Sequence, residues 1–303
     1  MGGDLDFGML RRLRRVFADL DAEIVHVHSR RGADFFAGRA CERDERAAVL
    51  TRRVDNPEPR AWARLKYRPY RHVVAISRAV REELCSSVGL DAARVPLIAS
   101  AVDTRAFRPD ANARGRVLRE FGLDDRALVI GIAAQLIPRK GHDLLLRVLP
   151  ELVRRAPRAQ LLCFGQGPQR ARLERLVAKL KLAPHVRFVG FRADFPELLP
   201  GLDLLVHPAV REGLGVAVLE AMAACVPVVA TAVGGIVDAV TDGVEGLLVA
   251  PGDGPGLAAA VERLIESEDD RLRLGTAGRA RVERAFSIAR MADQYVELYR
   301  NVH

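Results

Sequence analysis

The sequence predicts an α/β protein built on doubly wound parallel sheets. Short runs rich in Val, Ile and Leu alternate along the chain with longer amphipathic segments. These runs are continuously apolar, which is typical of strands that helices cover on both faces. The chain has 303 residues, 49% hydrophobic and 28% charged, which is a globular composition with room for two domains of ordinary size.

The first part of the chain contains four such runs. The expected strands are EIVHVH (23–28), RAAVLT (46–51), HVVAIS (72–77) and VPLIAS (95–100). Between and around them, apolar residues recur every three or four positions, which predicts helices over 8–20, 60–70, 78–88 and 112–121.

The second part of the chain repeats the pattern with more strands. The expected strands are 127–135, 159–165, 186–190, 202–208, 226–231 and 246–250. The expected helices are 142–154, 168–181, 194–200, 214–224, 235–241, 254–266 and 270–300, the last one broken near Ser287.

A linker separates the two parts. Residues 105–127 are expected to form a linker, one charged helix and the first strand of a new unit, so we place the boundary near 125. The expected domains are 1–125, 126–286 and a terminal helix over 287–303 that crosses back to the first domain. Four strands are fewer than a complete Rossmann-like half carries, so the first domain is expected to lack its first strands.

The excess of basic residues is concentrated in one stretch. The formal net charge is +8, and residues 52–81 contain nine Lys or Arg against two acids. Such a patch suits phosphate, anionic lipid or nucleic acid, and a solvated basic face is the alternative. Within it, RAWARLKYRPYRH (60–72) mixes Trp62, Tyr67 and Tyr70 with basic residues, which predicts peripheral binding to an anionic membrane. No nucleic-acid recognition motif is present.

Other classes of protein find little support. The four cysteines are scattered without zinc-site spacing, which favours buried thiols in a cytosolic protein. No apolar run approaches the roughly 20 residues that span a bilayer, and the first ten residues do not resemble a signal peptide.

The loops that follow strands carry the chemistry, because ligands of open α/β sheets bind at the carboxyl ends of the strands. Arg139 and Lys140 precede Gly141 and a helix start, which is typical of an anion site, although a solvated basic loop fits as well. The glycine turns 165–167 and 234–235 each lead into a further helix.

The most informative loop is REGLGVAVLE (211–220). Gly213 and Gly215 allow a ligand to approach the backbone, and the free N–H groups of the helix start suit a phosphate. A carboxylate beside a phosphate would repel it, so Glu212 and Glu220 must face something else. Polyols fit, because a carboxylate accepts hydroxyl hydrogen bonds well. A sugar at one acid, a ribose at the other and a diphosphate between them would fit this loop. The alternative is that both acids are surface residues.

These residues resemble the signature of the family 4 retaining glycosyltransferases, which have the GT-B fold. The resemblance implies two Rossmann-like domains that face each other across a cleft, an acceptor-side domain first and a nucleotide-sugar-binding domain second. It covers nearly the whole chain, and the matching motifs follow the family's order: IVHVHS (24–29), VVAISRAVREEL (73–84), VDTRAFRP (102–109), RKGHDLLL (139–146), FGQGP (164–168), VRFVGF (186–191), Glu212–Glu220 and DGVEGLLVAPGD (242–253).

The resemblance also implies the roles of site residues. Glu212 approaches the hydroxyls of the donor sugar, and Glu220 holds the ribose. His28, the second His of HVH, reaches the reaction centre. The other implied donor-binding residues are Gly213, Leu214 and Gly215 against the sugar and phosphates, Gln135, Arg139 and Lys140 around the diphosphate, and Gly190 and Phe191 near the base.

The sequence departs from the family pattern in four places. Gln135 replaces the usual Arg of the basic pair, so either Arg139 compensates or the phosphate is held more weakly. Asp238 replaces a Glu, and residues 100–101 replace an Asn-Gly pair. The family's first strands and their glycine-rich loop are not recognised, and Gly2-Gly3 cannot stand in for that loop because no strand precedes it.

The implied function is transfer of a sugar from a nucleoside-diphosphate-sugar donor to a glycan or lipid-linked acceptor, with retention at the anomeric carbon. No metal or other cofactor is expected, and Asp4-Leu5-Asp6 at the chain end is a poor metal motif. The expected location is the cytoplasm, with a peripheral position on the inner face of the membrane as the second expectation. A non-catalytic nucleotide-sugar-binding protein or fragment and another GT-B enzyme such as a nucleotide-sugar epimerase are the alternatives, and the E-x7-E spacing disfavours the epimerase.

Overall fold

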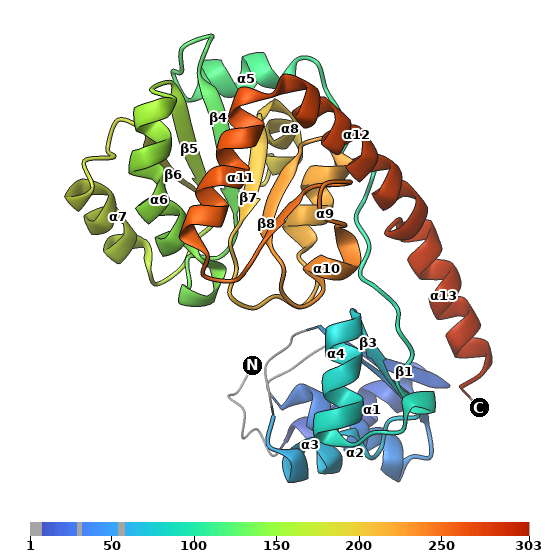
Figure 1. Cartoon of the computed structure of the whole chain (residues 1–303). Helices are drawn as coiled ribbons and strands as arrows, with labels where there is room; N and C mark the ends of the chain where they lie inside the picture. The colour runs from blue at the N-terminus through green and yellow to red at the C-terminus, as the bar shows by residue number, and fades with distance from the viewer. Residues whose placement is uncertain (1–7, 29–31, 54–57, 303) are drawn as a thin grey trace. The chain divides into compact units, whose positions relative to one another are not determined.

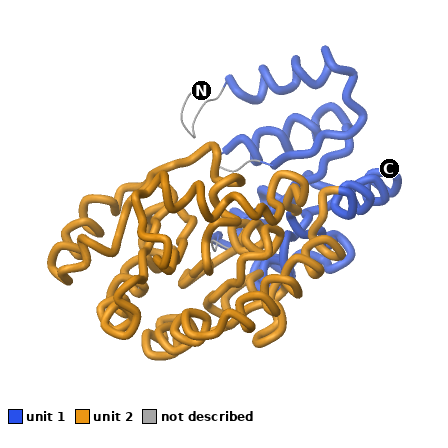
Figure 2. The backbone as a smooth tube through the Cα atoms, turned by 90° about the horizontal axis from the view of Figure 1, so that it is seen from above, with its two compact units in different colours: residues 1–100, 289–303 blue, residues 101–288 orange. Residues whose placement is uncertain are grey.

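A computed structural model describes residues 8–28, 32–53 and 58–302 (Figure 1). Gly2-Gly3 and Asp4-Leu5-Asp6 lie outside the described residues. The chain divides into two compact units: the first comprises residues 1–100 and 289–303, and the second comprises residues 101–288 (Figure 2).

The division falls at 100/101, whereas the sequence analysis expects a boundary near 125. The difference arises from α5 (Ala113–Glu120), which packs on the second unit. Arg114 of this helix donates to Asp203 at 2.6 Å, and Arg116 donates to the carbonyl of Glu197 at 2.9 Å. The segment that the sequence assigns to a linker and a charged helix is therefore part of the second unit.

The second unit is built on one six-stranded parallel sheet. The strand order is β6-β5-β4-β7-β8-β9, so the order reverses between β4 and β7. Ligands of doubly wound folds bind outside the carboxyl ends of the strands at such a reversal. The strands are β4 (Leu128–Ala133), β5 (Ala159–Phe164), β6 (Val186–Gly190), β7 (Leu204–His207), β8 (Val228–Thr231) and β9 (Leu247–Val249).

Helices cover both faces of this sheet, so every residue of β7 and β8 is buried. The helix α6 packs against α11, and α9 packs against α12 (Figure 1). The helices are α6 (His142–Arg155), α7 (Arg170–Lys179), α8 (Phe195–Leu198), α9 (Val216–Ala223), α10 (Ile236–Ala239), α11 (Gly254–Glu266) and α12 (Glu268–Ala285).

The first unit contains a parallel sheet with the order β1-β2-β3 among its described residues. Its strands are β1 (Ile24–Val27), β2 (Ala47–Arg52) and β3 (His72–Ala75). Its helices are α1 (Met9–Asp19), α2 (Ala33–Arg43), α3 (Arg60–Tyr67), α4 (Arg78–Glu82, continued as a π-helix to Val88) and α13 (Ile288–Arg300). The terminal helix packs Leu298 and Met291 on a core formed by Val49, Val74 and Ile98.

Two expectations about the elements were wrong. The strand expected over 95–100 is reduced to one bridge between Leu97 and Ala75, because Pro96 has no N–H to donate. The sequence analysis also missed α2, whose pattern is interrupted by Gly38. A β-carbon on Gly38 would lie 2.9 Å from the ring of Tyr70, so the glycine serves close packing at the expense of helix propensity.

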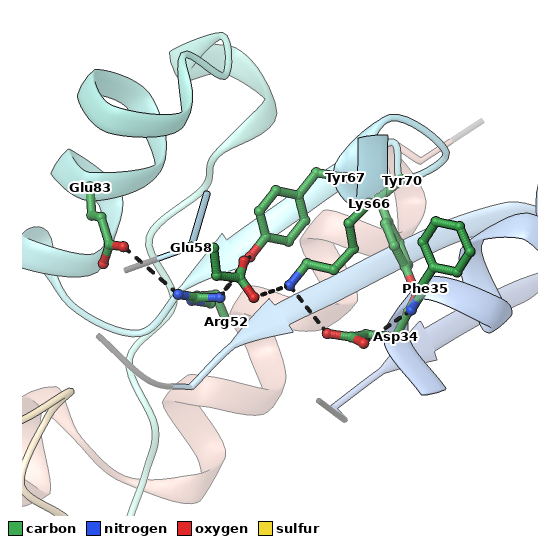
Figure 3. Close-up of polar contacts among 8 residues, drawn as sticks. All are labelled: Asp34, Phe35, Arg52, Glu58, Lys66, Tyr67, Tyr70 and Glu83. Carbon is green, nitrogen blue, oxygen red and sulfur yellow. Dashed lines mark hydrogen bonds and ion pairs between the residues drawn. The ribbon is translucent and has the colours of Figure 1, made fainter. Parts of the chain in front are cut away.

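Residues 60–72 are exposed only in part, so the aromatic and basic segment available to a membrane is smaller than expected. Tyr67, Tyr70 and Lys66 are all buried. Figure 3 shows Lys66 between Asp34 and Glu58, with ammonium-to-carboxylate distances of 3.3 and 2.5 Å. The alternation of bases and aromatics therefore reflects a helix that buries one face.

The break expected near Ser287 is confirmed, because α12 ends at Ala285 and α13 begins at Ile288. Within the described ranges, no helix combines the length and the apolar character that crossing a membrane requires.

Candidate functional site

The loops after β4 and β7 lock together at the reversal of strand order. Gly141 has φ of 75°, and a β-carbon there would lie 1.8 Å from the carbonyl oxygen of Pro208. The carbonyl of Arg139 also accepts a hydrogen bond from the N–H of Val210 at 2.8 Å. Only glycine permits this approach, which brings the basic loop against the loop that carries Glu212.

The loop after β8 packs against the loop that carries Glu212. Gly234 has φ of 51°, and a β-carbon there would lie 1.7 Å from the carbonyl oxygen of Glu212. The N–H of Gly235 donates to that oxygen at 3.3 Å. The backbone at Glu212 is therefore fixed from two neighbouring strands.

The side chain of Glu212 is held by three groups. Its Oε2 accepts a hydrogen bond from Lys140 Nζ and lies 2.8 Å from His207 Nε2, while Oε1 accepts from the N–H of Gly213 at 3.0 Å. Burial raises the pKa of Glu212, but the hydrogen bond from His207 and the charges of His207 and Lys140 outweigh it and hold the pKa at about 2. Glu212 is thus ionised at neutral pH and already paired with the cation expected to hold phosphate.

Glu220 lies in the opposite environment. It belongs to α9, and no described residue donates a hydrogen bond to its carboxylate or forms an ion pair with it. Burial alone raises its pKa to about 7. A half-buried carboxyl group without a protein partner among the described residues is available to a ligand that brings hydroxyl donors.

This environment predicts a pH-dependent stability difference for Glu220→Gln. A carboxyl group whose pKa is raised from 4.5 to about 7 on folding stabilises the protein at acid pH, and this contribution is lost as the pH rises through about 7. Above pH 8, Glu220→Gln should therefore be more stable than the parent by about 2–3 kcal/mol, with no such gain at pH 4. Calorimetric unfolding of both proteins across this pH range is the measurement, and a difference independent of pH would contradict the assignment.

The start of α9 faces the same edge. Gly215 precedes the helix with φ of 84°, no side chain caps the helix, and a β-carbon on Gly215 would lie 2.3 Å from Ile236 Cδ1. The side chain of Leu214 is 1% exposed, so it packs in the core. The expectation that Leu214 lies against a ligand is therefore limited to its backbone.

The remaining expected donor-binding residues follow β4 and β6. Gln135 is exposed and Arg139 half-buried in the loop after β4. Gly190 ends β6 with φ of 84°, and Phe191 after it is 72% exposed. These residues share the carboxyl edge of the sheet with Glu212. Among the described residues, no group of three or more His, Cys, Asp or Glu side chains could hold a metal ion.

His28 belongs to the first unit, directly after β1. Burial and the nearby charge of Arg53 lower the pKa of His28, which favours the neutral ring. It is exposed at the carboxyl end of the strand, where a side chain can reach a ligand of that unit.

Sequence analysis missed two buried histidines, His207 beside Glu212 and His142 near His207 and Lys140. His207 is 2% exposed at the end of β7, and His142 is 3% exposed at the start of α6, with no hydrogen-bond partner for either ring nitrogen. Burial, His207 and Lys140 lower the pKa of His142 to about 4. The sequence feature that could have indicated His207 is its position at the end of a strand, five residues before Glu212.

A doubly wound sheet with a cation and two carboxylates at its reversal of strand order is typical of an α/β protein that binds a ligand at that edge. The family follows from comparison with known proteins: the model "Glycosyl transferases group 1" matches residues 115–281, and "Glycosyltransferase Family 4" matches residues 2–106. The chain belongs to the group 1 glycosyl transferases, with a family 4 N-terminal part. The expected family is confirmed.

Curated relatives agree with this assignment. A GDP-mannose-dependent alpha-(1-6)-phosphatidylinositol monomannoside mannosyltransferase from Mycolicibacterium smegmatis is 38% identical over 216 residues, which is 68% of this chain and 56% of the relative. An alpha-D-kanosaminyltransferase from Streptomyces kanamyceticus is 29% identical over 92% of this chain and 70% of its own length. The matched region thus spans little more than half of the mannosyltransferase.

Solved structures establish the fold. Anabaena HepE in complex with UDP superposes with a TM-score of 0.88 at 21% identity, over 96% of this chain and 82% of that chain. Sucrose-phosphate synthase from Thermosynechococcus elongatus superposes with a TM-score of 0.81 at 24% identity, over 97% and 77% of the two chains. The expected GT-B fold class is confirmed.

Proposed function

We propose that the chain transfers a sugar from a nucleoside-diphosphate-sugar donor to an acceptor. The observation that carries the proposal is the contrast between two carboxylates on either side of one uncapped helix start. Glu212 is ionised and held by Lys140, whereas Glu220 is half-buried and has no partner in the described part of the chain. A donor with a ribose, a diphosphate and a sugar supplies the hydroxyls and the negative charge that this edge lacks.

In the proposed complex, the ribose hydroxyls bind Glu220 and the diphosphate lies on the free N–H groups of α9 and on Lys140. Lys140 then shares its charge between Glu212 and the phosphate, and Glu212 turns to the sugar hydroxyls. As the sugar leaves, negative charge develops on the diphosphate, and Lys140 with the helix N–H groups stabilises it. The proposal needs no metal for this step and extends to retention at the anomeric carbon and to a catalytic role for His28.

The relatives support this donor class. The Mycolicibacterium smegmatis enzyme is described as GDP-mannose-dependent, and HepE has been crystallised with UDP and glucose. Both ligands contain a nucleoside diphosphate, so the proposal for this chain concerns that class.

The direct test is a donor screen followed by a transfer assay. GDP-mannose, UDP-glucose and an ADP-sugar are added to the parent and to Glu220→Gln, and the shift in unfolding temperature is measured. One donor should stabilise the parent, and its affinity should be weaker in the variant by roughly 1–3 kcal/mol, the cost of losing charged hydrogen bonds. Equal binding by parent and variant would place the donor elsewhere. Binding without transfer to any glycan or lipid-linked acceptor would favour a non-catalytic binding protein.

We also propose that the acceptor lies at an anionic membrane and that the protein contacts this membrane. The contact surface is smaller than the sequence suggests. Trp62 and Leu65 are 44% and 43% exposed one turn apart on α3, and Trp62 stacks on Phe35 at 4.9 Å between ring centroids. Arg39 lies over the ring of Phe35, and the side chain of Arg68 is 73% exposed. We call these five residues the Trp62 surface; its aromatic and cationic character suits an interface with anionic lipid.

Sedimentation with vesicles tests this proposal. The parent should bind phosphatidylglycerol vesicles at low salt and dissociate at high salt, because exposed charges are screened there. Trp62→Ser should reduce binding several-fold, whereas Leu272→Ser, at an apolar residue of α12 that is 63% exposed, should not. Equal binding to neutral and anionic vesicles, or equal effects of the two substitutions, would reject the Trp62 surface.

A further inference from the structure

The ring of His26 is held on both sides by hydroxyl groups. His26 lies in β1, and its Nε2 is 2.8 Å from Thr51 Oγ1 of β2. Its Nδ1 is 2.5 Å from the hydroxyl of Tyr299, which belongs to α13. Thr51 Oγ1 also bonds the hydroxyl of Tyr295, one turn earlier on the same helix, at 3.0 Å. A chain of hydrogen bonds therefore runs from one tyrosine through Thr51 and His26 to the other.

The ring of His26, which belongs to this chain of hydrogen bonds, lies against the ring of His28. The rings of His26 and His28 have centroids 4.0 Å apart, and the ring centroid of Tyr295 lies 5.1 Å from that of His26 and 6.4 Å from that of His28. The groups that face the two imidazoles are thus Thr51, Tyr295 and Tyr299, together with the cation of Arg53 beside His28. No carboxylate among the described residues is hydrogen-bonded to either ring.

The hydrogen-bond chain accommodates a neutral His26. If Tyr295 donates to Thr51 and Thr51 donates to Nε2, then Nδ1–H donates to Tyr299; the opposite direction is equally complete. Burial and the charge of His28 lower the pKa of His26 to about 4, so the neutral ring persists at physiological pH. The tyrosines remain protonated, because burial raises the pKa of both phenols.

Packing alone does not require these hydroxyls. The apolar side chains of α13, Leu298 and Met291, already fill the contact with Val49, Val74 and Ile98. Phenylalanine at 295 and 299 would preserve the aromatic faces, but Nδ1 of His26 would lose its hydroxyl partner and Thr51 would lose the hydrogen bond to Tyr295. The hydroxyls therefore serve the orientation of the imidazole.

We infer that Tyr299 and Thr51 fix the ring plane and tautomer of His26, and that His26 and Tyr295 together orient His28 for the acceptor side of the reaction. Tyr295, Tyr299, Thr51 and His26 are then positioning residues that act through His28. The inference rests on the proposed function, since it gives the terminal helix a part in sugar transfer through the first unit.

The first test needs no activity. Nitrogen-15 shifts of the histidine rings distinguish a protonated from an unprotonated ring nitrogen, so they report tautomer directly. The full-length parent should show His26 in a single tautomer between pH 6 and 8. Tyr299→Phe should convert it to a mixture and move the His28 resonances. The matched control is Val296→Ala, at a residue of α13 that is 45% exposed, which should leave both histidines unchanged.

The second test uses transfer. Tyr299→Phe should lower kcat by roughly tenfold with KM for the donor unchanged, and should displace the pH profile, because misplacement of a reacting group reduces the rate without affecting donor contacts. Rates equal to the parent, or an equal loss in Val296→Ala, would overturn the inference. Absence of transfer by the parent would refute the proposed function, and the nitrogen-15 measurement would still decide whether Tyr299 controls His26 and His28.

Discussion

Glu212→Gln is expected to lower sugar transfer by about a hundred- to a thousandfold while nucleoside-diphosphate binding is kept or tightened. Glutamine preserves the size of the side chain but removes the charge that pairs with Lys140. The ammonium group is then free for the phosphates, so the diphosphate loses nothing. The sugar, however, loses a charged acceptor whose contribution to the transition state is of the order found for single groups in polar catalytic sites.

Calorimetry with the nucleoside diphosphate and a transfer assay with the donor sugar separate the two effects. Glu266→Gln is the control, at an exposed glutamate of α11 outside the candidate site. A parallel loss of binding and transfer would show that Glu212 holds the nucleotide itself. Full transfer by Glu212→Gln would remove it from the reaction.

Lys66→Met is expected to destabilise the first unit by about 3–5 kcal/mol, because removing one partner of a buried ion pair leaves the other charge uncompensated. Lys66 is 3% exposed and lies between Asp34, which is 5% exposed, and Glu58. Arg52 also pairs with the Glu58 carboxylate at 2.7 Å, so Glu58 keeps a cationic partner when Lys66 is replaced (Figure 3). The loss of charge compensation therefore affects mainly Asp34.

The measurement is denaturant unfolding followed by tryptophan fluorescence. Trp62 is the one tryptophan of the chain and belongs to the first unit, so its transition reports that unit. Arg68→Met is the matched control, since the Arg68 side chain is 73% exposed and its nearest carboxylate is 3.8 Å away; it should change the stability by under about 1 kcal/mol. Similar midpoints for parent and Lys66→Met would contradict the buried network.

Local pattern predicted most of the second unit. Apolar runs identified all six strands of its sheet, because the central strands β7 and β8 are buried on both faces and need no alternation. The spacing of Glu212 and Glu220 around two glycines also identified the loop after β7. The strand order, which places this loop beside Lys140, depends on contacts between distant segments and follows only from the structure.

The wrong expectations have the same origin, because they too depend on contacts between distant segments. The burial of Lys66 depends on Asp34, which is 32 positions away, and the helix that carries Asp34 contains a glycine that hides its pattern. The expected boundary near 125 ignored α5, whose arginines bond to residues more than 80 positions later. The pairing of Lys140 with Glu212 and the hydroxyl contacts of His26 likewise join segments that sequence periodicity treats separately.

Hydrogen exchange with and without a saturating nucleoside diphosphate tests the central claim most directly. With GDP or UDP bound, the proposal predicts slower exchange of the backbone amides over residues 136–142, after β4, and over residues 213–220, which comprise the end of the loop after β7 and the start of α9. The same segments should show little added protection in Glu220→Gln at equal ligand concentration. Protection confined to other segments, or tight binding of both nucleotides with no change in these two loops, would contradict a donor site at the reversal of strand order.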